Sequence, residues 1–136
     1  MSLVIEPSTL ASRALCQIER DLNSALIFLN EYELLMPEGK PCLDASYDEI
    51  QRKKACVELA LSNAYARVYA FRFVFADCAE YALFKSFSEW LFELSHGICL
   101  FHSVPDFRAA IQTLLDSILT RSVLDKPIVM TWGLIK

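Results

Sequence analysis

The side chains best suited to metal or acid–base chemistry lie in one short stretch, "ELSHGICLFHSVPD". It contains both histidines of the chain, and its ionisable or ligating residues are Glu93, His96, Cys99, His102 and Asp106. Glu93 and His96 have the E-x-x-H spacing with which carboxylate-bridged di-iron bundles present two ligands from one helical turn. Because the chain has no second such pair, a complete iron site requires a homodimer in which two copies meet. One hypothesis is therefore a homodimeric metal-binding helical bundle.

The same stretch allows two other chemical interpretations. Imidazole and thiolate groups suit zinc, so His96, Cys99 and His102 form a candidate zinc set. Steps of three residues drift by about 60° around an α-helix, so the three side chains converge only if the backbone changes at Gly97. Cys99 with either histidine could form a thiolate and base pair, but nothing in the sequence marks an orienting group or an oxyanion site. The simplest interpretation is that both histidines lie at a helix end and cap carbonyls.

Motifs of the common enzyme classes are absent from the sequence. There is no glycine-rich phosphate loop, no G-x-S-x-G and no H-E-x-x-H, so nucleotide hydrolysis, esterase and metalloprotease activities have no support. The net charge is −4, and the one tight basic cluster, residues 52–54, has acidic neighbours on both sides. Binding of nucleic acid usually needs a basic face. These features favour a non-enzymatic protein with no nucleic acid partner.

Composition points to one helical domain. A chain of 136 residues is the usual size of a single domain. Hydrophobic residues make up 54% and charged residues 22%, which is too apolar for disorder and rich for a soluble chain, so a second subunit could cover part of the surplus. The three glycines and five prolines fall outside the long apolar stretches, as an all-α fold requires. We expect a single helical domain over residues 1–136.

The cysteines and the N-terminus indicate the cytoplasm. The five cysteines are an odd number without a C-x-x-C pair, and four of them lie within helical patterns, where cysteine acts as a small buried hydrophobe. Glu6 precedes the first basic residue, Arg13, and no apolar segment follows that would predict a secretory signal. Charged residues interrupt the aromatic stretch 68–92 every few positions, so we expect no transmembrane segment there.

Two long helices are predicted in the first half of the chain. The first covers residues 7–36, with Ser8 or Thr9 as N-cap, because apolar residues recur at alternating spacings of three and four. They are Leu15, Ile18, Leu22, Ala25, Leu29, Tyr32 and Met36. The second opens with a capping box at Ser46 and Glu49 and is apolar on most sides, which predicts a central place in the bundle. Its residues 68–76 also alternate with the period of a strand; we favour helix because no breaker interrupts them.

Two shorter helices and a tail follow. The third helix begins after Asp77, and its apolar seam is Phe84, Phe87, Leu91, Leu94 and Ile98. The fourth covers residues 105–123 with Pro105 near its first position. Pro127 and several β-branched residues make residues 126–136 an extended tail that must dock on the bundle or on a partner. The predicted fold is an all-α, single-domain, mainly antiparallel four-helix bundle with a C-terminal extended tail.

The aromatic residues suggest how the protein works. Those of residues 65–92 fall mostly on the inward faces of two helices, which predicts a core that could include a dimer contact. Trp90, Phe92 and Phe101 do not fit inward with the third seam and, with Trp132 of the tail, mark a candidate interaction face. We expect a cytosolic, self-associating protein-interaction module such as an adaptor, a small chaperone or an inhibitor or immunity-type partner. The alternatives are the metal bundle, with iron or zinc, and a helical small-molecule sensor or carrier.

The sensor or carrier hypothesis places a ligand pocket beneath four aromatic side chains. These are Phe71, Phe75, Phe84 and Trp90, which the predicted second and third helices would bring together. Ligand pockets are commonly lined by aromatic side chains, but so are ordinary cores, and the core is the simpler interpretation of this set.

Overall fold

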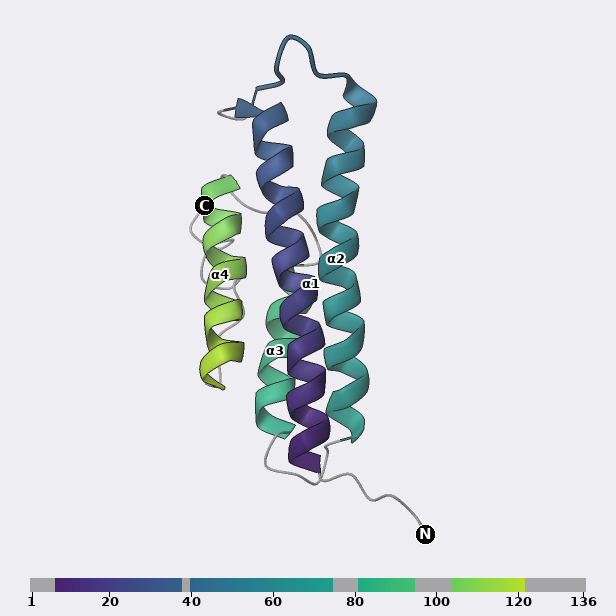
Figure 1. Cartoon of the computed structure of the whole chain (residues 1–136), viewed down its shortest axis with the longest axis vertical. Helices are drawn as coiled ribbons and strands as arrows, with labels where there is room; N and C mark the ends of the chain where they lie inside the picture. The colour runs from purple at the N-terminus through teal and green to yellow at the C-terminus, as the bar shows by residue number, and fades with distance from the viewer. Residues whose placement is uncertain (1–6, 38–39, 75–80, 95–103, 122–136) are drawn as a thin grey trace.

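The protein is an all-α bundle, as the sequence predicts (Figure 1). The computed structural model describes residues 7–37, 40–74, 81–94 and 104–121. These parts form the helices α1 (Pro7–Leu35), α2 (Tyr47–Val74), α3 (Tyr81–Leu94) and α4 (Val104–Thr120), and contain no strand. Successive helices run in opposite directions along the long axis, which confirms the antiparallel arrangement. The predicted tail lies outside the described residues.

Helix α1 starts and stops at sites that satisfy its end groups. It begins at Pro7, so Ser8 and Thr9 lie in the first turn and the predicted N-cap is placed too late. Proline suits the first helical position because its fixed φ fits the helix and its missing N–H has no partner there. At the other end, Cys42 donates from its backbone N–H to the carbonyl of Leu35 (2.9 Å) and from its thiol to that of Leu34 (3.1 Å). The loop thereby binds carbonyls that the helix leaves unpaired.

Helix α2 confirms the predicted cap and resolves the helix-or-strand question. The backbone N–H of Glu49 donates to the Ser46 hydroxyl oxygen at 3.1 Å, so Ser46 is the N-cap. The helix then continues without interruption to Val74, so residues 68–74 are helical; residues 75–76 lie outside the described parts. The alternating aromatics divide between two faces, since Tyr69 and Phe73 are exposed while Phe71 packs against the core.

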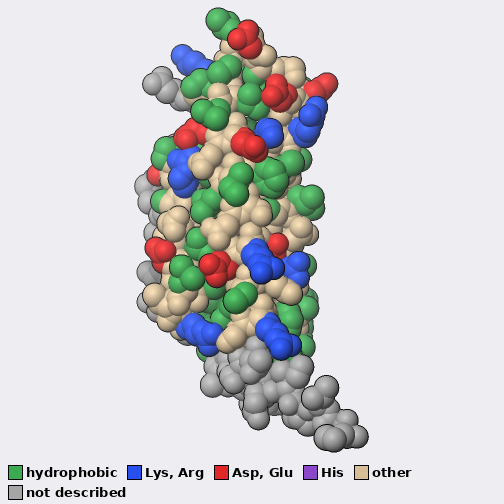
Figure 2. All heavy atoms as spheres, in the orientation of Figure 1, with side chains coloured by type: hydrophobic (Ala, Val, Ile, Leu, Met, Phe, Trp, Pro, Cys, Tyr) green, Lys and Arg blue, Asp and Glu red, His purple; other side chains and the backbone are tan. Residues whose placement is uncertain are grey.

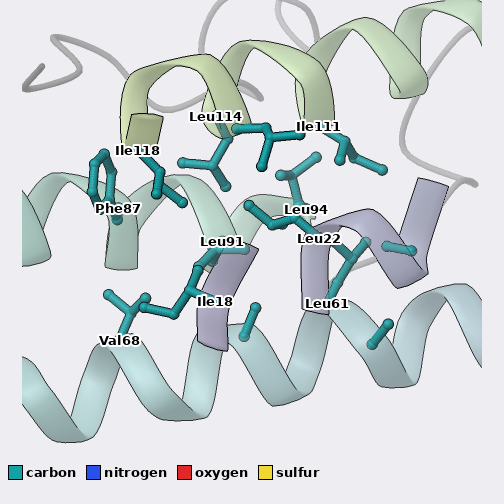
Figure 3. Packing of buried hydrophobic residues seen from close by; sticks show 14 of the residues in the cluster. Ile18, Leu22, Leu61, Val68, Phe87, Leu91, Leu94, Ile111, Leu114 and Ile118 are labelled. Atoms are coloured by element: carbon teal, nitrogen blue, oxygen red, sulfur yellow. The ribbon is translucent and has the colours of Figure 1, made fainter. Parts of the chain in front are cut away.

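All four helices contribute to one hydrophobic core (Figure 3). The predicted seams are its main components, and the residues labelled in Figure 3 come from every helix: Ile18, Leu22, Leu61, Val68, Phe87, Leu91, Leu94, Ile111, Leu114 and Ile118. Full burial of one such side chain stabilises a fold by about 1.5–3 kcal/mol relative to exposure. The three-and-four spacing of apolar residues is therefore the main source of the fold.

Helix α2 lies at an edge of the bundle and not at its centre. It packs against α1 and α3, and Figure 1 shows no helix on its outer side. The expected central position is therefore wrong. In a ring of four helices each member has two neighbours, so the apolar residues on the outer side of α2 have no described helix to cover them.

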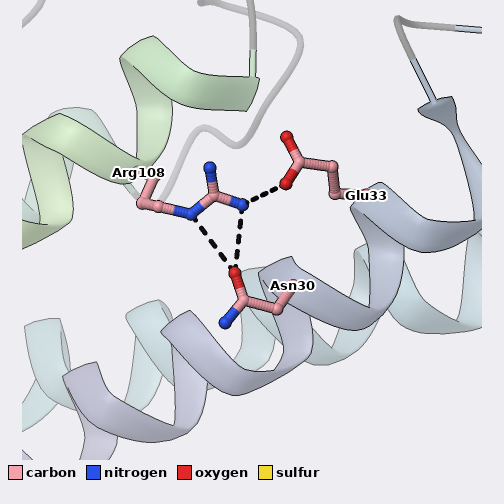
Figure 4. A network of polar contacts seen from close by, with 3 residues as sticks. All are labelled: Asn30, Glu33 and Arg108. Carbon is pink, nitrogen blue, oxygen red and sulfur yellow. Dashed lines mark hydrogen bonds and ion pairs between the residues drawn. The ribbon is translucent and has the colours of Figure 1, made fainter.

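Charged and polar side chains join α1 to its neighbours at the surface. On α4, Arg108 donates to the Glu33 carboxylate (2.6 Å) and, from two nitrogens, to the Asn30 amide oxygen (3.0 and 3.2 Å), as Figure 4 shows. On α2, Arg67 pairs with Asp21 at 2.8 Å. Partly exposed pairs of this kind contribute at most about 1 kcal/mol each, so they align the helices while the core holds them together.

Replacing the cap of α2 tests its local structure. Ser46→Ala removes the acceptor for the Glu49 N–H and should lower the free energy of unfolding by about 1 kcal/mol. Ser46→Asp keeps an acceptor oxygen at the same place and should retain the stability. Urea unfolding followed by circular dichroism measures both, and equal stability of the alanine and aspartate variants would contradict the capping role.

Candidate interaction face

The outer side of α2 carries a second seam, made of uncharged and mostly apolar residues. Its members alternate at spacings of four and three: Ala55, Leu59, Ser62, Ala66, Tyr69 and Phe73. We call these six residues the outer seam; all are exposed. The exposed fraction is 61% for Leu59, 43% for Tyr69 and 58% for Phe73. The outer seam has no charged member and extends about five turns, or about 27 Å.

The outer seam lies opposite the buried side of the same helix. The buried residues of α2 include Val57, Leu61, Ala64 and Val68, which also repeat at spacings of four and three. At 100° per residue the two sets point to opposite sides of the helix. A helix that is apolar all round is normally covered all round. In Figure 2, hydrophobic side chains appear along the edge of the molecule that α2 forms.

A connected group of aromatic rings continues the exposed surface onto α3. Tyr65 lies 5.8 Å from both Tyr69 and Phe92, measured between ring centroids, and Tyr69 lies 5.1 Å from Phe73 with the rings edge to face. The Arg72 guanidinium carbon is 5.3 Å from the Tyr69 ring centre and 5.2 Å from that of Phe73, within the range of a cation–π interaction. We call these four rings the aromatic cluster. Tyrosine and arginine are enriched among residues that dominate protein–protein binding.

A cavity of about 300 Å³ opens beside the aromatic cluster, between α2 and α3. Its lining consists of Tyr65, Arg72, Ser88, Glu89, Phe92 and Glu93. In the described parts of the chain, no ion pair joins Arg72 to either carboxylate, and the buried Nε of Arg72 has no hydrogen-bond partner. The cavity therefore combines aromatic surface with charges of both signs.

Of the predicted site residues, two line the cavity and a third packs against the hydrophobic core. Phe92 is 48% exposed and Glu93 is half-buried, and both line the cavity. Trp90 packs against the core, and its buried Nε1 has no partner among the described residues. The other candidates, Phe101, Trp132, His96, Cys99 and His102, lie outside the described parts of the chain.

The sensor hypothesis and the metal hypothesis both depend in part on residues outside the described parts of the chain. Phe71 and Phe84 pack with ring centroids 6.3 Å apart, and Phe84 is fully buried. Phe75 lies outside the described residues, so the sensor hypothesis stays a prediction. No group of three or more metal-ligating side chains occurs within the described ranges, and the metal hypothesis, which depends on residues 96–102, stays a prediction.

Sequence reasoning missed the outer seam, although its signal is present. The signal is a common spacing of three and four that links Ala55, Ala66 and Tyr69 with Leu59 and Phe73. Without this spacing, the residues are not recognised as one face of a helix. The pattern alone does not say which of the two seams of α2 faces the core. That choice depends on which side α1 and α3 cover.

Comparison with known proteins gives no relative from which a role for the outer seam or the aromatic cluster could be inferred. No family model, curated protein or solved structure matches this chain. Among the described helices, none combines the length and the apolar character needed to cross a membrane. The outer seam and the aromatic cluster are accordingly the features from which a function can be argued.

Two phenylalanines of α3 give a matched test of core against surface. Phe87 is fully buried, so Phe87→Ala should lower the free energy of unfolding by about 3–5 kcal/mol. Phe92 is 48% exposed and its ring lies 5.8 Å from that of Tyr65, so Phe92→Ala removes less buried surface and should cost less than about 1.5 kcal/mol. Urea unfolding measures both values. Equal losses would show that Phe92 belongs to the core and not to an interaction face.

Proposed function

We propose that this protein is a non-enzymatic protein–protein interaction module that self-associates, with α2 as its binding helix. The observation that carries the proposal is the uncharged outer seam, exposed along about five turns of a helix whose opposite side is buried. Contiguous apolar surface of this kind marks interaction sites in soluble proteins. Leu59, Tyr69 and Phe73 are its large anchors.

The chemistry of the face suits a specific contact. Covering apolar surface gains roughly 25 cal/mol for each Å², so the three large side chains supply a favourable term when a partner removes them from water. Arg72 and the aromatic cluster border the same face and add groups that commonly dominate binding energy. The absence of charge in the outer seam means that two copies can meet there without burying an unpaired ion.

The proposed setting is the cytoplasm. Within the described parts of the chain the cysteines Cys16, Cys42 and Cys56 are free thiols, as a reducing compartment would keep them. An adaptor, a small chaperone or an inhibitor or immunity-type partner would each use such a face without catalysis. A self-associating face fits all three roles.

The cavity beside Phe92 favours a second candidate, a small-molecule sensor or carrier. Its volume of about 300 Å³ is at the lower end for ligand pockets, and its lining offers Arg72 to an anionic group and Glu89 and Glu93 to a cationic one. Native mass spectrometry of untagged protein purified without chelator separates the candidates. An oligomer without added mass supports the interaction module, whereas a bound organic molecule or metal would favour a carrier or a metal bundle.

Two exposed leucines provide a matched test of the proposed face. We expect the wild-type protein to form an oligomer whose population rises with concentration. Leu59→Lys should raise the dissociation constant by at least about tenfold, because a symmetric contact buries the new charge twice. Leu119→Lys, on α4, changes a side chain of similar exposure (58% against 61%) and should leave assembly unchanged.

Sedimentation velocity over a range of concentrations measures assembly, and circular dichroism confirms that both variants keep their helix content. A wild-type protein that stays monomeric throughout would contradict the proposal. An equal effect of both substitutions would also contradict it, since general surface charge would then be the cause.

A further inference from the structure

We propose that the occupant of the outer seam is a second copy of this chain, packed antiparallel about a two-fold axis that crosses α2 between Ser62 and Ala66. This inference rests on the proposed function. It adds the identity of the partner, the relative direction of the two α2 helices and the residues that face each other. It follows from two independent properties of the face: the order of side-chain sizes along it and the charges beside it.

The sizes of the outer-seam residues are self-complementary in the antiparallel direction. A two-fold axis at the centre of the outer seam sets Ser62 against Ala66, Leu59 against Tyr69 and Ala55 against Phe73 of the other copy, because each pair is centred on position 64. Small residues at the crossing let the two backbones approach closely. Phe73, at one end of the outer seam, then meets the small side chain of Ala55, at the other end.

A parallel arrangement in the same register would lose this fit. Every residue would face its own copy, so Phe73 would meet Phe73 at one end and Ala55 would meet Ala55 at the other. Such a contact is crowded at one end and hollow at the other, whereas interfaces pack as densely as protein interiors. Size therefore favours the antiparallel pair.

The charges beside the outer seam favour the same direction. Glu58 and Arg72 are two heptads apart and lie on the side of α2 that faces α3, where Arg72 lines the cavity. Within the described residues neither has an ion-pair partner, whereas Arg67 on the opposite side already binds Asp21. Glu58 and Arg72 are thus charges of opposite sign on the side next to α3 that are available to a partner.

The antiparallel register brings these two charges together across the axis. Position 58 faces position 70 of the other copy, which is two residues, or about 3 Å along the helix, from position 72. Glu58 of each copy therefore meets Arg72 of the other, and the symmetry forms this pair twice. In a parallel pair the two-fold axis runs along the helices, so the side next to α3 in one copy lies on the opposite flank of the contact from the same side in the other, and Glu58 and Arg72 do not meet across it.

Exchanging the two charges tests the pairing. Glu58→Arg alone and Arg72→Glu alone each create like-charge contacts, so each should raise the dimer dissociation constant by at least about tenfold. The double variant, or an equimolar mixture of the two single variants, restores opposite charges and should return the constant to within about threefold of the wild type. Sedimentation equilibrium measures these constants. Glu19→Arg makes the same change of charge on α1 and should have no effect.

A second exchange avoids Arg72, whose replacement next to Glu89 could disturb the fold. Leu59→Lys and Tyr69→Glu should each weaken the dimer, and mixing the two variants should recover it. In the mixed dimer, the lysine introduced in one copy faces the glutamate introduced in the other. No single chain in this mixture carries both substitutions, so recovery reports a contact between copies.

The outcomes separate this inference from the proposed function. Suppose that Leu59→Lys weakens the dimer but that neither the charge exchange nor the mixture of Leu59→Lys and Tyr69→Glu restores it. This result would overturn the antiparallel register and leave the proposed interaction module standing. A wild-type chain that binds a different protein through α2 but never itself would overturn the second copy as occupant. Recovery in both exchanges, with an unchanged Glu19→Arg variant, is the result that we expect.

Discussion

The central constraint on this molecule is that α2 is apolar on two opposite faces, while the bundle can cover only one of them. The face with Val57, Leu61, Ala64 and Val68 is buried against α1 and α3. Once those positions point inward, the helical geometry forces the outer seam into solvent. The core and the exposed surface are therefore two consequences of one sequence pattern.

The remaining features follow from how α2 is held. Its N-terminus is fixed by Ser46, and its inner face is fixed by packing, so its outer face is a rigid surface and not a loop. Arg67 and its partner Asp21 occupy the border towards α1, which leaves the border towards α3 to Tyr65 and Arg72. A rigid surface loses little conformational entropy on binding, and its anchors are already in place. This combination supports a role in recognition.

Much of the fold could be predicted from the sequence, because seams of apolar residues at spacings of three and four are clear in every helix. Leu22, Phe87 and Leu91 were expected in the core and are there. Two expectations failed for different reasons. The N-cap of α1 was placed too late because proline is itself a good first residue, which is a local effect. The edge position of α2 depends on which helices pack against it and could not be seen from α2 alone. Of the candidate site, Phe92 could be recognised as a residue that does not fit inward, whereas the outer seam required knowing which face was covered.

The most direct test is an isotope-filtered NMR measurement on an equimolar mixture of ¹³C-labelled and unlabelled protein, which detects only contacts between different copies. The account predicts intermolecular contacts from the methyl groups of Ala55 and Leu59 to aromatic rings, and from Ala66 to the backbone around Ser62. Intermolecular contacts that avoid α2, or none at concentrations where the protein is fully folded, would contradict the claim that a second copy covers the outer face of this helix.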